Sequence, residues 1–70
     1  MAPREKLAKM RAEAGLTQRE IALELGMTDQ AVSNWEQGIS IPKLTPMQTL
    51  LLCEILECSL KELVDAFKET

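Results

Sequence analysis

Residues 28–38, TDQAVSNWEQG, place amide and hydroxyl side chains beside two apolar residues, Val32 and Trp35. Gln30 and Asn34 are four residues apart, so they share one face if this stretch is helical. The amide of Gln or Asn can pair with both N6 and N7 of adenine and so distinguish base pairs. The alternative to base recognition is that Gln30 and Asn34 are simply polar side chains exposed to solvent. Because the stretch contains no Lys or Arg, any attraction for phosphate must come from elsewhere in the chain.

Charge is unevenly distributed along the 70 residues, whose formal net charge is -3. Up to residue 43 the basic and acidic residues balance: Arg4, Lys6, Lys9, Arg11, Arg19 and Lys43 against Glu5, Glu13, Glu20, Glu24, Asp29 and Glu36. The remaining residues contain only Lys61 and Lys68 against Glu54, Glu57, Glu62, Asp65 and Glu69. A DNA-binding surface would therefore lie within the first 43 residues.

The length of the chain predicts one small domain over residues 1–70. No apolar run approaches the roughly 20 residues of a membrane span, and residues 1–15 lack the apolar core of an export signal. We therefore expect a cytoplasmic protein without a membrane segment. The sequence has no His or Tyr and no phosphate-cradling Gly loop, so we expect neither an enzyme nor a bound cofactor.

Three segments predict helix starts by the capping-box pattern, in which Ser or Thr is followed three residues later by Glu or Gln. They are TQRE (17–20), TPMQ (45–48) and SLKE (59–62). Together with the apolar spacing and the Gly stops, they predict five helices and no strands. The expected ranges are 3–14, 18–25, 28 to 36 or 37, 46–56 and 60–68.

The second and third of these helices are separated only by Gly26, Met27 and Thr28, as in a helix-turn-helix. Ala22 is small enough for the next helix to cross close to it, and Gly26 supplies a left-handed turn. The residues expected to fill the space between the helices are Ile21, Leu25, Met27, Val32 and Trp35. Trp35 could instead stack on bases, but its offset from Val32 and Ile21 favours a core position.

The segment GLTQREIALELGMTDQAVSNWEQG, residues 15–38, resembles the phage-repressor/Cro-like (XRE) helix-turn-helix family, and SLKELV resembles the family's fifth helix. The resemblance covers about residues 5–65. It implies an all-α, five-helix lambda-repressor-like DNA-binding domain. It also implies a transcriptional regulator that binds palindromic double-stranded DNA as a homodimer, with residues 28–37 in the major groove.

The resemblance also implies roles for individual residues. Positions that contact base edges are Thr28, Asp29, Gln30, Ser33 and Asn34, and Gln18 matches a position that holds a phosphate. Arg11 and Glu36 match an ion pair, although Arg11 could contact phosphate instead. Asp29 could accept from cytosine N4, but it also suits the positive end of its own helix and would repel phosphates. Lys9, Arg19 and Lys43 are further candidates for phosphate contact, whereas Arg4 and Lys6 could equally be a solvated helix face.

Two departures from the family pattern affect the second half of the chain. About two extra residues, around Thr45 and Pro46, leave the contacts of Lys43 open. Glu57 stands where a helix-ending Gly is common, and a left-handed conformation would cost it about 1 kcal/mol. This departure predicts that helix 46–56 ends differently.

Leu51 and Ile55 form an apolar face to one side of the expected core face, which predicts a two-fold dimer contact. In the alternative, the extra loop residues rotate the helix and bury both. Cys53 and Cys58 are expected to be buried thiols, since a disulfide between them is doubtful on a helix-like backbone. One subunit lacks the ligands for a four-coordinate zinc site, so no metal is expected.

A second functional class fits the same fold. The acidic and apolar C-terminal half could contact a protein partner, as in an antitoxin or an adaptor. Binding of a stoichiometric protein without DNA binding at low salt would favour this class over a DNA-binding regulator.

Overall fold

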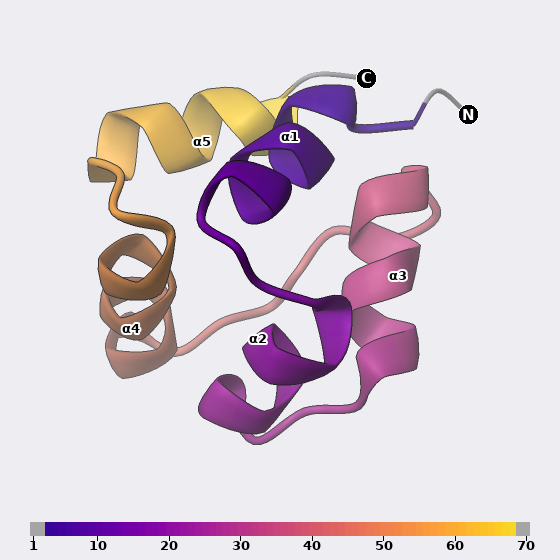
Figure 1. The fold of residues 1–70 in the computed structure, drawn as a ribbon, viewed down its shortest axis with the longest axis horizontal. Helices are drawn as coiled ribbons and strands as arrows, with labels where there is room; N and C mark the ends of the chain where they lie inside the picture. Colours follow the sequence, from indigo (N-terminus) through magenta and orange to yellow (C-terminus); the bar gives the residue numbers. More distant parts are fainter. Residues whose placement is uncertain (1–2, 69–70) are drawn as a thin grey trace.

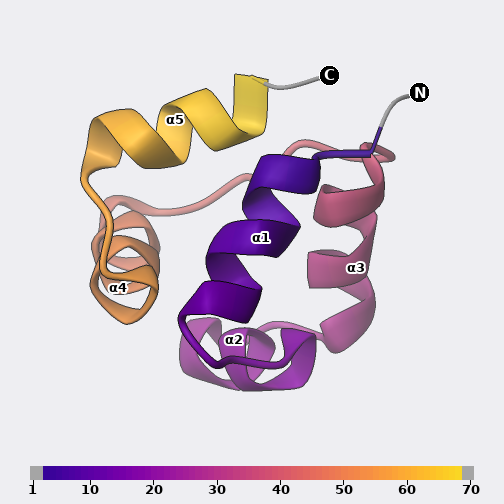
Figure 2. The same ribbon diagram turned by 45° about the horizontal axis from the view of Figure 1, so that its top comes forward.

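The computed structural model of the chain describes residues 3–68, and within this range the protein consists of five α-helices without a strand. They are α1 (Glu5–Glu13), α2 (Gln18–Leu25), α3 (Asp29–Gln37), α4 (Pro46–Leu56) and α5 (Leu60–Lys68). The predicted all-α class is confirmed. In Figures 1 and 2, α2 and α3 lie next to each other, while α4 and α5 lie on the other side of the molecule.

The first helix begins later than predicted. Arg4 precedes it in a non-helical conformation, with φ -89° and ψ 78°. The reason is a tertiary contact, because the backbone N–H of Arg4 donates to the carbonyl of Glu36 at 2.6 Å. The end of α3 therefore fixes where α1 starts.

All three predicted capping boxes are present. In each, the hydroxyl accepts a hydrogen bond from the backbone N–H three residues on, at 3.1 to 3.2 Å, while the fourth side chain accepts from the first N–H. Thr28 caps α3 in a simpler way, since its hydroxyl accepts from the N–H of Ala31 at 3.3 Å. These bonds satisfy N–H groups that a helix start leaves without partners.

Helix ends use left-handed residues, as the sequence suggested for Gly26 and Gly38. Their φ values are 69° and 77°. Glu57 adopts the same conformation, with φ 53° and ψ 47°, although it has a side chain. The idea that α4 ends differently because it lacks Gly is therefore wrong. The left-handed conformation of Glu57 destabilises the turn by about 1 kcal/mol. The chain then continues directly into the capping box of α5.

All five helices contribute buried residues to one core: Leu7, Ile21, Ala22, Leu25, Val32, Trp35, Leu52, Leu56, Leu63 and Ala66. Leu52 and Val32 are the largest side chains that are fully buried. Trp35 meets Phe67 edge to face, with ring centroids 6.1 Å apart. The expectation that Trp35 belongs to the core is confirmed, so it is not a platform for stacking bases.

Arg4 has a role that the sequence did not indicate. It is 2% exposed, so the interpretation of this residue as a solvated helix face is wrong. Its guanidinium donates to the carbonyls of Trp35, Ser40 (2.8 Å) and Phe67 (3.2 Å) and lies 5.8 Å from the centre of the Phe67 ring. A cation placed among carbonyls at the end of α3 is favourable. Arg4 therefore joins α1, the end of α3 and α5.

Candidate nucleic-acid interface

The recognition-type helix α3 has an inner face that fixes it and an outer face that is polar. Val32, Trp35 and Glu36 are buried. Asp29 and Gln30 are exposed, and Ser33 and Asn34 are half-buried. The four predicted base-reading residues of α3, with Thr28 at its cap, thus lie together at the surface. The buried residues hold the backbone beneath them in one orientation.

Side chains on this outer face hydrogen-bond to each other. Gln30 Nε2 donates to Asn34 Oδ1 at 2.9 Å, and Gln37 Nε2 donates to Ser33 Oγ at 2.7 Å. Gln30 retains its carbonyl oxygen and a second amide hydrogen, the two groups that adenine pairing uses. Gln37 was not among the residues predicted for this face, although its spacing of four residues from Ser33 is typical of such a contact.

Asp29 lies in the first turn of α3, where a carboxylate is favoured by the helix dipole. It lines a surface hollow with Arg19 and Thr28, at the turn between α2 and α3. A cationic side chain is thus available close to the one negative charge in the outer face.

Glu36 organises a polar network beneath the start of α2. It is 8% exposed and accepts two hydrogen bonds from Arg11, at 2.6 and 3.1 Å. Gln18 Nε2 donates to the same carboxylate at 3.0 Å, and Arg11 also donates to the carbonyl of Leu16 at 2.9 Å. The hydrogen bond to Glu36 raises the pKa of Arg11, although burial opposes this shift. The ion pair therefore places Gln18 and the first turn of α2 relative to α3.

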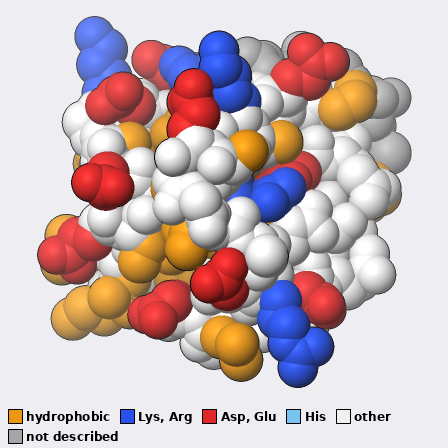
Figure 3. Space-filling view, in the orientation of Figure 1, with side chains coloured by type: hydrophobic (Ala, Val, Ile, Leu, Met, Phe, Trp, Pro, Cys, Tyr) orange, Lys and Arg blue, Asp and Glu red, His pale blue; other side chains and the backbone are white. Residues whose placement is uncertain are grey.

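The three candidate cations do not form one patch. Arg19 and Lys43 are exposed on α2 and on the loop before α4. Lys9 instead borders a hollow between α1 and α5 with Glu5, Glu13 and Glu62. Residues 9 and 11 point to nearly opposite sides of a helix, so Lys9 lies away from the α3 side, which Arg11 faces. Figure 3 shows Lys and Arg side chains dispersed among acidic ones.

A comparison with protein families agrees with this geometry. A helix-turn-helix family model matches residues 7–63, which include α2, the turn and α3. The chain belongs to this family. The match confirms the resemblance to phage-repressor/Cro-like proteins and the lambda-repressor-like fold, and it makes the protein a DNA-binding regulator in the general sense of the family. Among curated proteins, none matches the chain.

No helix between residues 3 and 68 is long and apolar enough to cross a membrane. Within the same residues, no group of three or more His, Cys, Asp or Glu side chains is arranged to hold a metal ion.

The predicted dimer residues are less exposed than expected. Leu51 and Ile55 are partly buried and pack against the core, so their interpretation as a free apolar face needs correction. With Leu52 and Leu56 at the centre of its inner face, α4 brings Leu51 and Ile55 to the edges of the core. The residues that it exposes instead are Met47 (63%) and Leu50 (54%).

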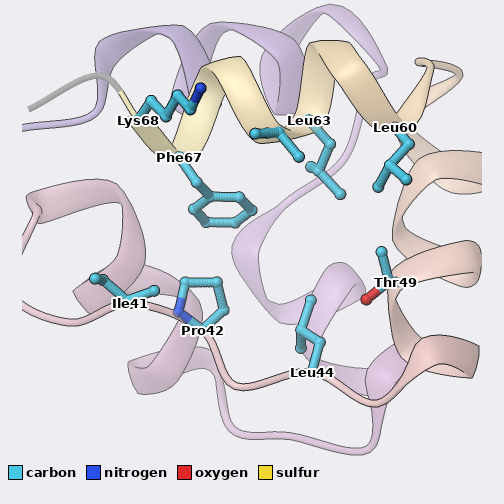
Figure 4. Close-up of a pocket in the computed structure, with 9 residues that line it drawn as sticks. Ile41, Pro42, Leu44, Thr49, Leu60, Leu63, Phe67 and Lys68 are labelled. Atoms are coloured by element: carbon cyan, nitrogen blue, oxygen red, sulfur yellow. The ribbon is translucent and has the colours of Figure 1, made fainter.

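A shallow apolar groove lies between α5 and the loop before α4 (Figure 4). Leu60, Leu63 and Phe67 line it from α5, facing Ile41, Pro42 and Leu44 of the loop. Its volume is about 300 Å³. Ile41, Leu60 and Val64 are exposed along its border. The C-terminal half thus carries more exposed apolar surface than the outer face of α3.

Proposed function

We propose that this protein is a sequence-specific transcriptional regulator that binds palindromic double-stranded DNA as a homodimer, with α3 in the major groove. The observation that carries the proposal is the outer face of α3. Its amide and hydroxyl side chains lie together on a helix that is anchored by Val32, Trp35 and the Glu36 network. Such a helix can present base-reading groups without rearranging.

Base reading in this proposal centres on Gln30. Its carbonyl oxygen accepts from adenine N6 and its remaining amide hydrogen is donated to N7, while Asn34 holds the other hydrogen. Asn34 keeps its own amide group for an acceptor on a neighbouring base. Thr28 and Ser33 supply hydroxyls, and Asp29 accepts from cytosine N4 where that base is present.

Phosphate contacts position the protein in this proposal but do not specify sequence. Gln18 and the N-terminal N–H groups of α2 would hold one phosphate, and Arg19 and Lys43 would contact others. Lys9 is left out because it borders the α1–α5 hollow. Two cations per subunit give a dimer a salt slope of about -4 in log K against log salt. The affinity for non-specific DNA should therefore be weak and should be lost at a low salt concentration.

The dimer contact is assigned to exposed apolar residues of the C-terminal half, in place of Leu51 and Ile55. The exposed side chains on α4 and α5 are Met47, Leu50, Leu60 and Val64. A two-fold axis through this surface would place two copies of α3 on half-sites about 34 Å apart. The acidic side chains of α4 and α5 would then lie nearer to the dimer contact than to the DNA.

The test is selection of bound sequences from a random double-stranded DNA pool, followed by gel-shift titration of the enriched sequence. We expect an inverted repeat with half-sites one helical turn apart, bound at least about a thousandfold more tightly than scrambled DNA. Recovery of unrelated sequences after several rounds would contradict sequence-specific binding.

A second candidate function rests on the exposed apolar residues and the groove beside α5. In that case the domain would bind a protein partner through its C-terminal half, as an antitoxin or adaptor does. Stoichiometric capture of one protein, together with no DNA binding at low salt, would favour this function over the first.

A further inference from the structure

The turn between α4 and α5 brings the two cysteines together. Glu57 is left-handed, and its N–H donates to the carbonyl of Glu54 at 3.2 Å. The N–H of Cys58 donates to the carbonyl of Cys53 at 3.0 Å. This pair of bonds is the Schellman motif, in which the residue after the left-handed one folds back against the last helical turn. Here the two residues that meet are Cys53 and Cys58.

Both cysteines are free thiols and half-buried. Cys58 is hydrogen-bonded to the side chain of Cys53, and burial, the Cys53 thiol and Glu62 together raise the pKa of Cys58 to about 11. Cys58 also lines an open hollow with Met10 and Glu13 of α1 and with Glu57 and Glu62. Cys58 is thus in contact with Cys53, protonated at neutral pH, and accessible to a small molecule.

The backbone path explains why the sequence did not suggest this arrangement. On a continuous helix, residues five apart point in directions that differ by about 140°, so their sulfurs cannot bond. The left-handed conformation of Glu57 ends the helix between them and returns Cys58 to the side of Cys53.

We propose that Cys53 and Cys58 form a dithiol site that closes reversibly to an intramolecular disulfide by exchange with a low-molecular-weight disulfide such as oxidised glutathione. One cysteine thiolate attacks the small disulfide and releases one thiolate, leaving a mixed disulfide on the protein. The second cysteine thiolate attacks the protein sulfur of that bond and releases the other. The protein loses two electrons and two protons, and the oxidant is reduced to two thiols.

The site lies away from the proposed base-reading face of α3. Figure 1 places the α4–α5 connection on the side of the molecule opposite α3. Closure would lock a turn that is already formed and leave the outer face of α3 unchanged. Operator affinity of the oxidised protein should stay within about twofold of the reduced one.

The experiment equilibrates the full-length protein in glutathione buffers of graded ratio, blocks free thiols by alkylation, and measures the products by mass spectrometry. We expect a monomer that has lost two hydrogen atoms and resists alkylation at both cysteines. The effective concentration of the pair should be at least about tenfold higher in the folded protein than in concentrated urea. A value no higher than in urea, a stable mixed disulfide with glutathione, or disulfide-linked dimers would overturn the proposal.

Two substitutions at Glu57 test the geometry itself. Glu57→Gly favours the left-handed turn and should keep or raise the effective concentration. Glu57→Val disfavours that conformation and should lower it about fivefold or more relative to Glu57→Gly. Equal values for the two variants, with both shown to be folded by circular dichroism, would also overturn the proposal.

Discussion

Replacement of Arg4 by Met should destabilise the protein far more than a substitution one residue before a helix normally does. The guanidinium donates to three carbonyls that belong to the end of α3, the following loop and α5. Met fills a similar volume and keeps the packing against Phe67, but it cannot donate a hydrogen bond. The variant therefore isolates the loss of the guanidinium charge and its hydrogen bonds.

The magnitude follows from the burial of each bond. Only the bond to the carbonyl of Trp35 is fully buried, and the other two are partly buried. The Trp35 carbonyl still accepts from the N–H of Gly38 at 3.2 Å, so the cost is that of losing one buried hydrogen bond from a charged donor, about 2 kcal/mol. The two partly buried carbonyls can recover water, so we assign them about 0.5 kcal/mol each. The expected loss is about 3 kcal/mol, a large share of the roughly 4–10 kcal/mol typical of a chain this size.

Urea unfolding followed by Trp35 fluorescence measures this loss directly. With a slope of about 1 kcal/mol per molar urea, the midpoint should fall by about 3 M. Arg4→Lys keeps the charge without the planar fork and should lose about half as much. Lys43→Met, on an exposed residue, serves as the control. A loss below about 0.5 kcal/mol for Arg4→Met would refute the reasoning that Arg4 joins the three segments.

Three further predictions concern other parts of the molecule. Arg11→Met leaves the buried carboxylate of Glu36 poorly compensated and should lower the free energy of unfolding in urea by about 3 kcal/mol. The double variant Arg11→Met, Glu36→Leu should recover part of that stability. Additive losses for the two substitutions would contradict coupling between the residues. Because the pKa of Cys58 is raised from 9.0 to about 11, the rate of its alkylation at pH 8 should be ten- to a hundredfold lower in the folded protein than in urea, and this rate should rise about tenfold per pH unit. Peptide-resolved mass spectrometry measures the rate at this cysteine. Equal rates in the folded and unfolded protein would count against the raised pKa. Leu60→Glu should convert a dimer to a monomer in sedimentation equilibrium, whereas Lys61→Glu beside it should not; an unchanged dimer in Leu60→Glu would exclude this part of the surface from the contact.

Local patterns predicted most of the fold because each depends on a few neighbouring residues. The three capping boxes, the left-handed Gly26 and the inner positions of Val32 and Trp35 all follow from spacing within one or two turns. The residues of the outer face of α3 could be listed for the same reason. The spacing of Gln30 and Asn34 predicted that they share one face, but the hydrogen bond between them appears only in the structure.

Features that depend on tertiary placement could not be read from the sequence. Arg4 is a charged residue in a polar stretch, and only the approach of α3 and α5 shows that it is buried. The rotation of α4 about its axis decides whether Leu50 or Leu51 faces outward. Because α4 is apolar on nearly all sides, its sequence pattern does not reveal this rotation. The contact between Cys53 and Cys58 depends on a left-handed Glu57, which residue preference opposes.

The central claim is that α3 reads bases through Gln30 while other elements supply the charge. The most direct measurement is a gel-shift comparison of Gln30→Ala and Lys43→Ala on the selected site and on versions with single base-pair changes. Gln30→Ala should lose discrimination worth about 1–3 kcal/mol at one base pair in each half-site. Lys43→Ala should weaken binding to all versions alike and reduce the salt slope by about one unit for each copy of the residue that contacts phosphate. If Gln30→Ala keeps the full preference at every base pair, α3 does not read the DNA through this residue and the account is contradicted.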